Sequence, residues 1–316
     1  MSSKPLVLVA GATGATGKPI THALLESGNF AVAVLTRPSS VSKSEIEALR
    51  ARGAEIRTAD INSDSVERLT EVLSGVDILI SAVNAVALLG QKPLFSAAKA
   101  AGVKRVVPCD FATPGARGVR QLHDEKLEIH DYIKELGLGY TLIDIGWWQQ
   151  LYLPSSTSSP AISGPMSHEI FGDGNKKNLL TDLEHVGVWV ARIVADERTL
   201  NQSVIVWEDE KTLLEAQEIG ERVSGEGEFI KSKRTNVTHE EILARAKAGK
   251  EAYQRSHSYA DFGLWCVSEY MVSLHILGEN TLENAKALGA LDARELYPDI
   301  KPVTLEGYAK RFYKKA

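Results

Sequence analysis

The 316-residue sequence has few cysteines, no long apolar run and no excess of basic residues, and each absence excludes a class of protein. Its two cysteines, Cys109 and Cys266, are too few and too far apart in sequence for a disulfide framework or a cysteine-based zinc site. No apolar run approaches the roughly 20 residues that a membrane-spanning helix needs. With 36 basic and 41 acidic residues the formal net charge is -5, which argues against a general nucleic-acid-binding protein.

The start of the chain and its composition give expectations about location and partners. Met1–Pro5 has no charged region that leads into a long apolar run, as a secretory signal would, so we expect a cytoplasmic protein. Hydrophobic residues make up 44% of the chain and charged residues 24%, which is typical of one large or two moderate globular domains. We expect a small-molecule substrate, no nucleic-acid or membrane partner, and a monomer or homodimer.

Short apolar runs alternate with helical patterns through the first half, which predicts an α/β fold with a Rossmann-type, doubly wound parallel sheet. After Gly146 the composition changes, because Trp147 and Trp148 precede a Ser/Pro-rich run. We therefore predict a dinucleotide-binding domain over 1–153 and a smaller α+β, mainly substrate-binding domain over 154–316, with some segments returning to the first domain. The predicted strands are 6–9, 31–35, 55–57, 77–83, 103–107, 140–145 and 169–171, and the predicted helices begin after Gly17 or cover 44–52, 66–73, 93–101, 121–136, 183–194 and 238–248.

A glycine-rich loop follows the first predicted strand and opens the first predicted helix. Small residues let the backbone turn tightly and approach a pyrophosphate, and the helix N-terminus supplies N–H groups. A tight turn without a ligand is the alternative, but the strand before and the helix after favour a dinucleotide site. The cofactor-binding residues predicted here are Gly11, Thr13, Gly14, Ala15, Thr16 and Gly17.

The end of the second predicted strand indicates which dinucleotide binds. An acidic residue there would accept hydrogen bonds from an NAD ribose, whereas this sequence has Arg37, with Lys43 six residues further on. A guanidinium pairs with a phosphate through two charge-assisted hydrogen bonds. The placement of Arg37 therefore predicts NADPH rather than NADH as the cofactor.

One lysine interrupts the apolar stripe of the long helix predicted over 121–136. Leu122, Ile129 and Ile133 lie on that stripe, and Lys126 occupies the missing step, four residues after Leu122 and three before Ile129. An inward lysine here would lie near the carboxyl ends of the strands, and partial burial would suit it for proton transfer. The pattern alone leaves open whether Lys126 instead extends to solvent.

Two histidines flank Lys126 on the same predicted helix. His123 and His130 are seven residues apart, without carboxylates arranged as an obvious ligand set, so we predict no metal site. Each is more typical of a helix surface than of a catalytic site.

Several of these segments together resemble the isoflavone reductase-like family, which includes the phenylcoumaran benzylic ether and pinoresinol–lariciresinol reductases. That family is part of the NmrA-like, atypical short-chain dehydrogenases, and the loop over 112–120 resembles its fungal members. The resemblance covers nearly the whole chain. It rests on Gly11–Gly17, Arg37, Val106–Phe111, Lys126, Phe171–Asn175 and Leu296–Ile300, in that order.

The resemblance implies an NADPH-dependent reductase in which Lys126 is the general acid/base. In agreement with this, the long helix carries no Tyr-x-x-x-Lys pair, because Tyr132 is followed by Lys134. We expect hydride transfer to a small aromatic substrate that is phenolic, isoflavonoid-like or a benzylic ether. Cofactor contacts are expected from Ala82, Val83, Asp110, Phe111 and Lys126, and substrate contacts from Phe111, Trp147 and Trp148.

Two segments depart from the plant pattern of the family, namely residues 112–120 and 144–150. Both are expected to border the substrate, so a plant substrate is not carried over. Trp147 and Trp148 suit stacking on an aromatic ligand and equally suit core packing. A different class also stays open, an NmrA-like regulator that binds NADP(H) and senses redox state without turnover, because a fold does not determine function.

Overall fold

A computed structural model describes residues 4–314 of the chain and divides it into two compact units. Unit 1 comprises the chain up to Phe111 together with Glu125–Asp144 and Glu184–Val204. Unit 2 comprises Ala112–Asp124, Ile145–Leu183 and the chain from Ile205 onward. The predicted domain boundary at residue 153 stays a prediction. Of the segment Met1–Pro5 used above, the first three residues lie outside the described part.

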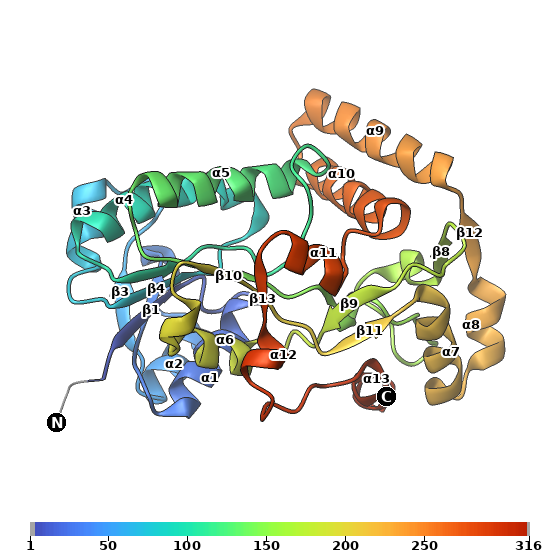
Figure 1. Cartoon of the computed structure of the whole chain (residues 1–316), viewed down its shortest axis with the longest axis horizontal. Helices are drawn as coiled ribbons and strands as arrows, with labels where there is room; N and C mark the ends of the chain where they lie inside the picture. The colour runs from blue at the N-terminus through green and yellow to red at the C-terminus, as the bar shows by residue number, and fades with distance from the viewer. Residues whose placement is uncertain (1–3, 315–316) are drawn as a thin grey trace. The chain divides into compact units, whose positions relative to one another are not determined.

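Unit 1 is built on a five-stranded parallel sheet with the order β3-β2-β1-β4-β5 (Figure 1). This order reverses direction between β1 and β4, as in a doubly wound fold, and it confirms the predicted α/β class. Apolar residues fill both faces of β1 and β4, because helices cover both. The strands are β1 (Leu6–Ala10), β2 (Ala31–Thr36), β3 (Glu55–Thr58), β4 (Ile78–Ser81) and β5 (Arg105–Val107).

The sixth predicted strand forms, but it does not pair along its length with the fifth. β6 (Thr141–Asp144) lies beside β10 (Gln202–Ile205), and a single bridge from Val106 to Tyr140 joins it to the main sheet. β5 is three residues long, and Pro108 directly after it has no N–H with which to extend a ladder.

Helices cover the two faces of this sheet. A cluster of buried apolar residues, including Leu8, Leu79, Phe95 and Ile133, packs α3, α4 and α5 on one face (Figure 1). On α6, a Cβ at Gly187 would lie 2.1 Å from the Pro19 carbonyl oxygen of α1, so glycine allows the two helices to touch. The helices are α1 (Gly17–Ser27), α2 (Ser44–Ala51), α3 (Val66–Val72), α4 (Lys92–Ala100), α5 (Gln121–Glu135) and α6 (Val186–Val194), with 3-10 turns η1 (Pro38–Ser40), η2 (Ala85–Ala87), η3 (Leu89–Gln91) and η6 (Glu197–Thr199).

Unit 2 is a mixture of short strands and helices. Five of its strands form a three-stranded sheet, β11-β9-β7, and a pair, β12-β8. The predicted strand 169–171 and the predicted helix from 238 are present as β8 and α9, whereas most other elements are too short to leave a periodic pattern. The elements are β7 (Trp147–Trp148), β8 (Glu169–Phe171), β9 (Asn178–Thr181), β11 (Asp209–Lys211), β12 (Thr235–Val237), β13 (Ala290–Asp292), α7 (Leu213–Ser224), α8 (Gly227–Lys233), α9 (His239–Ser256), α10 (Tyr259–Met271), α11 (Leu282–Ala287), α12 (Ala293–Leu296), α13 (Leu305–Phe312), η4 (Gln149–Leu151), η5 (Gly164–His168) and the π-helical η7 (Val272–Leu277).

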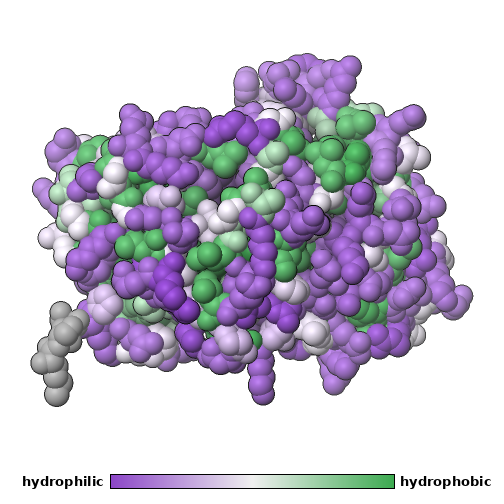
Figure 2. Space-filling model, viewed as in Figure 1, coloured by the Kyte–Doolittle hydropathy of each residue, from purple (hydrophilic) through white to green (hydrophobic). Residues whose placement is uncertain are grey.

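The surface is mixed in character (Figure 2). Apolar side chains appear over α9 and α10, where Leu243 and Leu264 are each about half exposed. Among the helices of residues 4–314, none has both the length and the hydropathy to cross a membrane.

Candidate functional site

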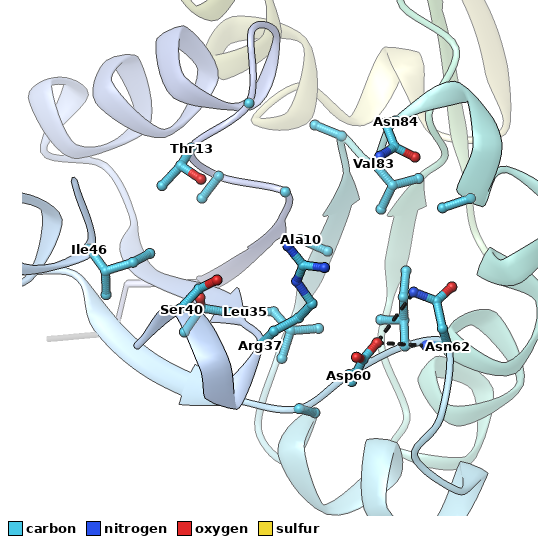
Figure 3. A pocket seen from close by; sticks show the side chains of 18 of the residues that line it. Ala10, Thr13, Leu35, Arg37, Ser40, Ile46, Asp60, Asn62, Val83 and Asn84 are labelled. Carbon is cyan, nitrogen blue, oxygen red and sulfur yellow. Dashed lines mark hydrogen bonds between the residues drawn. The ribbon is translucent and has the colours of Figure 1, made fainter. Parts of the chain in front are cut away.

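A pocket of about 320 Å³ opens at the carboxyl ends of β1, β2 and β4, where the strand order reverses (Figure 3). Ligands of doubly wound folds bind at this place. Among the described residues, the predicted cofactor contacts Ala15, Thr16, Gly17, Asp110, Phe111 and Lys126 are not part of the lining of this pocket. Those that line the pocket are Gly11, Thr13, Gly14, Arg37, Lys43, Ala82 and Val83.

The glycines hold the loop close to β4. Gly11 has a φ of 81°, and a Cβ there would lie 2.3 Å from the Ala82 carbonyl oxygen. A Cβ at Gly17 would lie 2.1 Å from the Gly11 carbonyl oxygen. The Gly14 N–H donates to that same oxygen over 3.0 Å. Glycine is therefore required at positions 11 and 17 for the loop to fold back on itself.

The loop leaves the N-terminus of α1 available to an anion. Thr16 is the N-cap residue, and its side chain makes no capping hydrogen bond in this structure. The first N–H groups of a helix lack intrahelical partners and carry the positive end of the helix dipole. A pyrophosphate at this end would receive hydrogen bonds from the backbone.

Arg37 extends from the end of β2 into the pocket, as Figure 3 shows. Ser40 and Lys43, the residue that precedes α2, also line the pocket. Asp60 and Asn62 lie across the pocket from Arg37, and the Asp60 carboxylate accepts hydrogen bonds from the Asn62 backbone N–H at 3.0 Å and side-chain amide at 3.3 Å. Asp60 and Asn62 were not predicted, because they follow a strand in a loop that carries no motif.

A second group of side chains gathers beyond the end of β5. Lys126 is buried, with 6% of its surface exposed, and its Nζ donates to the Asp110 carbonyl oxygen over 2.5 Å. Four residues along α5, the His130 imidazole Nε2 lies 2.7 Å from the Asp110 carboxylate Oδ1. The inward direction predicted for Lys126 is thus observed, and solvent exposure of this lysine is not. The involvement of His130 was not predicted, because its spacing on the helix is equally typical of a surface residue.

The backbone after Asp110 adopts an uncommon conformation. Phe111 has a φ of 38°, in the left-handed region that residues other than glycine rarely occupy. The Asp110 N–H donates to the Pro108 carbonyl oxygen over 2.9 Å, which closes a tight turn. The Phe111 N–H donates to the Ile143 carbonyl oxygen of β6 over 3.0 Å, and the ring is buried. A conformation of this kind persists where the surroundings hold it, often at functional sites.

Cys109 fixes the other side of this turn. Its N–H donates to the Gln91 side-chain oxygen over 3.2 Å, and its thiol donates to the Val83 carbonyl oxygen over 3.0 Å. Burial raises the pKa of the Cys109 thiol to about 11, so it stays protonated at neutral pH. Cys109 therefore links the turn to Val83 of the pocket as a hydrogen-bond donor, and its raised pKa disfavours a role as a nucleophile.

The two tryptophans that were predicted to contact substrate are adjacent in β7 of unit 2, and their side chains have different surroundings. Trp147 lines a small cavity of about 30 Å³ together with Tyr152, Met271 and His275, whereas Trp148 is not among its lining residues within the described chain. The Trp147 ring lies against Tyr270 with centroids 5.0 Å apart. Adjacent residues of a strand point to opposite sides, which accounts for the separation.

His275 makes the stability of unit 2 sensitive to acid. The ring is stacked on Phe171 at 5.1 Å, and burial lowers the pKa of His275 from 6.5 to about 4. An unfolded chain takes up a proton here below pH 6.5 and the folded chain does not, so stability falls as the pH drops from 6.5 toward 4. We measure the unfolding free energy in urea at pH 7.5 and at pH 4.5. The drop between the two pH values should be about 2 to 3 kcal/mol smaller in His275→Leu than in the unmodified protein.

The matched control for this prediction is His257→Asn, which changes an exposed histidine and keeps a residue that tolerates the left-handed conformation, φ 50°, at that position. It should retain the acid sensitivity of the unmodified protein. An identical pH dependence in His275→Leu and in the unmodified protein would contradict the assignment to His275.

A Tyr-x-x-x-Lys spacing does occur outside α5, at Tyr297 and Lys301. Tyr297 is buried at the end of α12 and Lys301 is exposed in the following loop. The two do not share a helix, so they do not form the tyrosine–lysine arrangement of one helical face.

Comparison with known proteins identifies the family. The family model described as "NmrA-like family" matches residues 3–309. The chain belongs to the NmrA-like family. Among curated relatives of this NmrA-like chain, the asnovolin J 5',6'-dehydrogenase nvfM of Aspergillus novofumigatus is 36% identical, covering 96% of this chain and 94% of the relative. The probable pinoresinol-lariciresinol reductase 3 of Arabidopsis thaliana is 28% identical, covering 96% of each.

A solved structure also matches the NmrA-like chain along its length. The complex of leucoanthocyanidin reductase with NADPH from Vitis vinifera has a TM-score of 0.79 at 24% identity, covering 98% of this chain and 99% of that one. The predicted family, fold class and oxidoreductase class are confirmed by these findings. The predicted cofactor, NADPH, is the one held by that solved relative.

Proposed function

We propose that this protein is an NADPH-dependent reductase that acts on a small aromatic substrate, with Lys126 as the general acid/base. The observation that carries the proposal is the buried Lys126, whose Nζ is held by a hydrogen bond to the Asp110 carbonyl oxygen at the carboxyl end of the sheet. Such a place, beside the switch point of a doubly wound sheet, is where a ligand's reactive end is expected.

The pocket has the chemistry that NADPH needs. Gly11, Thr13 and Gly14 would hold the pyrophosphate, together with the N-terminus of α1 behind them. Arg37 and Lys43 would bind the 2'-phosphate, because two cations and no acidic side chain follow β2. When bound, NADPH supplies a hydride to an electrophilic carbon of the substrate.

The chain's own residues orient the reactants and handle the proton. Ala82, Val83, Asp110 and Phe111 are proposed to line the nicotinamide end, where the buried Phe111 ring excludes water. Lys126 Nζ gives a proton to a developing oxyanion of the substrate, or takes one from a phenolic hydroxyl. The amine is held at a fixed place by the Asp110 carbonyl oxygen, which lowers the cost of orienting it in the transition state.

The proposed substrate class is supported by the names of the relatives and by the aromatic residues of unit 2. By their names, the relatives described above act on asnovolin J and on pinoresinol or lariciresinol. Trp147 and Trp148 stay proposed contacts for an aromatic ring, with Trp147 backed by Tyr270. We propose phenolic, isoflavonoid-like or benzylic-ether compounds as the first class to examine.

The experiment that tests this function follows NADPH absorbance over a panel of phenols, quinones, enones and benzylic ethers, with NADH as the parallel cofactor. Turnover with NADPH is expected for at least one aromatic compound. Arg37→Gln is expected to weaken NADPH binding about 10- to 100-fold and to leave NADH binding nearly unchanged, since a charge-assisted hydrogen bond is worth about 1.5–3 kcal/mol. Arg50→Gln, an exposed change on α2, is the control.

Two outcomes would contradict the proposal in different ways. Tight NADPH binding without oxidation of any compound in the panel would favour an NADP(H)-binding sensor. A protein that binds neither dinucleotide would refute the cofactor site and the reductase together.

A further inference from the structure

One face of α5 presents two titratable side chains to the same buried residue. Lys126 and His130 are four residues apart, which places them one turn apart on that face. Lys126 Nζ reaches the backbone carbonyl of Asp110 at 2.5 Å, and His130 Nε2 reaches the carboxylate of Asp110 at 2.7 Å. Asp110 is thus held by α5 through its main chain and its side chain at once.

Stability alone does not account for this arrangement. Asp110 is 5% exposed, and its second carboxylate oxygen, Oδ2, is buried without a hydrogen-bond partner among the described residues. Removing a carboxylate from water costs several kcal/mol, which a single hydrogen bond does not restore. Apolar residues of similar size at 110 and 130 would avoid that cost, so the pair has a use other than holding the fold together.

The turn at Asp110 needs support from several sides, because Phe111 has a positive φ that costs about 1–3 kcal/mol. Cys109 is tied to Gln91 and Val83, and the Phe111 N–H is tied to Ile143. These contacts fix the turn on the side of the sheet. The side that faces α5 is held by His130, through the Asp110 carboxylate.

The position of the Lys126 amine depends on this support. Its acceptor is the carbonyl of the same peptide unit that leads into Phe111, so a rotation of that peptide would move the acceptor. We propose that Asp110 and His130 are positioning residues, whose side-chain hydrogen bond fixes the turn and thereby holds Lys126 Nζ in place. This inference rests on the proposed function of Lys126, and neither Asp110 nor His130 is assigned a proton-transfer step.

The test uses three variants of the full-length protein. His130→Ala removes the bond to Asp110, and His130→Gln restores a donor that reaches the carboxylate. Glu135→Gln changes an exposed residue near the end of α5 and is the matched control. For each protein, kcat, KM and the NADPH dissociation constant are measured with a substrate found in the panel. The rate at which an amine-reactive reagent labels Lys126 is read by peptide mass spectrometry, relative to Lys104, whose side chain is 77% exposed.

We expect His130→Ala to lower kcat about 10- to 100-fold, as for the loss of one charged hydrogen bond, with the NADPH dissociation constant within about twofold. Labelling of Lys126 relative to Lys104 should become about tenfold faster, because the lysine is no longer held. His130→Gln should return both values to within about fivefold of the unmodified protein. In a Lys126→Met background, His130→Ala should have little further effect on kcat, since the two residues act as one unit.

Unchanged kcat and unchanged labelling in His130→Ala would overturn the inference, as would a full additional loss in the Lys126→Met background. If His130→Ala does not fold, His130→Asn, whose amide is too short to reach Asp110, breaks the same bond. The labelling readout needs no turnover, so it decides whether His130 holds the lysine even if the reductase function fails. Full activity in Lys126→Met would refute the proposed function and leave the structural part of the inference to that readout.

Discussion

Lys126→Met is expected to lower kcat by about 100- to 10,000-fold, the range that a positioned general acid/base contributes. Methionine has a similar length and an apolar character, so it fits a buried position on α5 and removes the amine without opening a large cavity. The NADPH dissociation constant should stay within about twofold, because the substitution leaves the pocket-lining residues, Gly11 and Arg37 among them, unchanged. Single-turnover absorbance and fluorescence titration measure the two quantities separately.

Lys134→Met is the control for this prediction. It lies on the same helix and is exposed, and its Nζ lies 5.8 Å from the centre of the Tyr140 ring. It should keep near-normal kcat. A Lys126→Met protein that turns over at more than half of the normal rate would show that another group moves the proton, and a large loss of NADPH binding in this variant would mean that the lysine contacts the cofactor.

Gly11→Ala is expected to destabilise unit 1 by about 2–5 kcal/mol, which combines the strain of a positive φ with overpacking. The new Cβ would lie 2.3 Å from the Ala82 carbonyl oxygen, which is backbone and cannot swing aside. The loop would have to leave β4, so NADPH binding should be lost at temperatures where the variant is still folded. Urea unfolding followed by circular dichroism gives the stability, and fluorescence titration gives the binding.

Gly28→Ala separates the two contributions. Gly28 ends α1 with a φ of 65°, yet a Cβ there would meet nothing within 4 Å. This control should therefore show the backbone strain alone, about 1–2 kcal/mol, with normal cofactor binding. Equal losses of unfolding free energy in Gly11→Ala and Gly28→Ala would contradict a clash at Gly11. The close approach of the loop to β4 would then add nothing to the cost of the substitution.

The elements of unit 1 could be predicted because their signals are local. Apolar runs such as that of β4 and the stripe of Leu122, Ile129 and Ile133 on α5 each indicate one kind of structure. Most elements of unit 2 could not be predicted in this way. β7 has two residues and β12 has three, and strands of that length exist through their partners and not through a periodic pattern.

The residues of the candidate site differ in the same way, because some belong to local motifs and others depend on contacts between distant parts of the chain. The loop around Gly11 and the cation at Arg37 belong to short motifs, and the inward direction of Lys126 followed from a gap in a stripe. The contact between His130 and Asp110 joins residues 20 positions apart, and the turn that allows it depends on a positive φ at Phe111. No propensity predicts that conformation for phenylalanine, so the pair could be found only in three dimensions.

The protonation state of Cys109 affects how readily the protein is alkylated. Quinones and quinone methides alkylate thiolates far faster than thiols, and this cysteine directly precedes Asp110, whose carbonyl oxygen holds Lys126. With a pKa of about 11, its thiolate at neutral pH is on the order of a hundredfold scarcer than that of an ordinary exposed cysteine, whose pKa is about 8.5. If the protein turns over electrophilic aromatic compounds beside this residue, as proposed, we expect alkylation of Cys109 to be slower than that of an ordinary exposed cysteine.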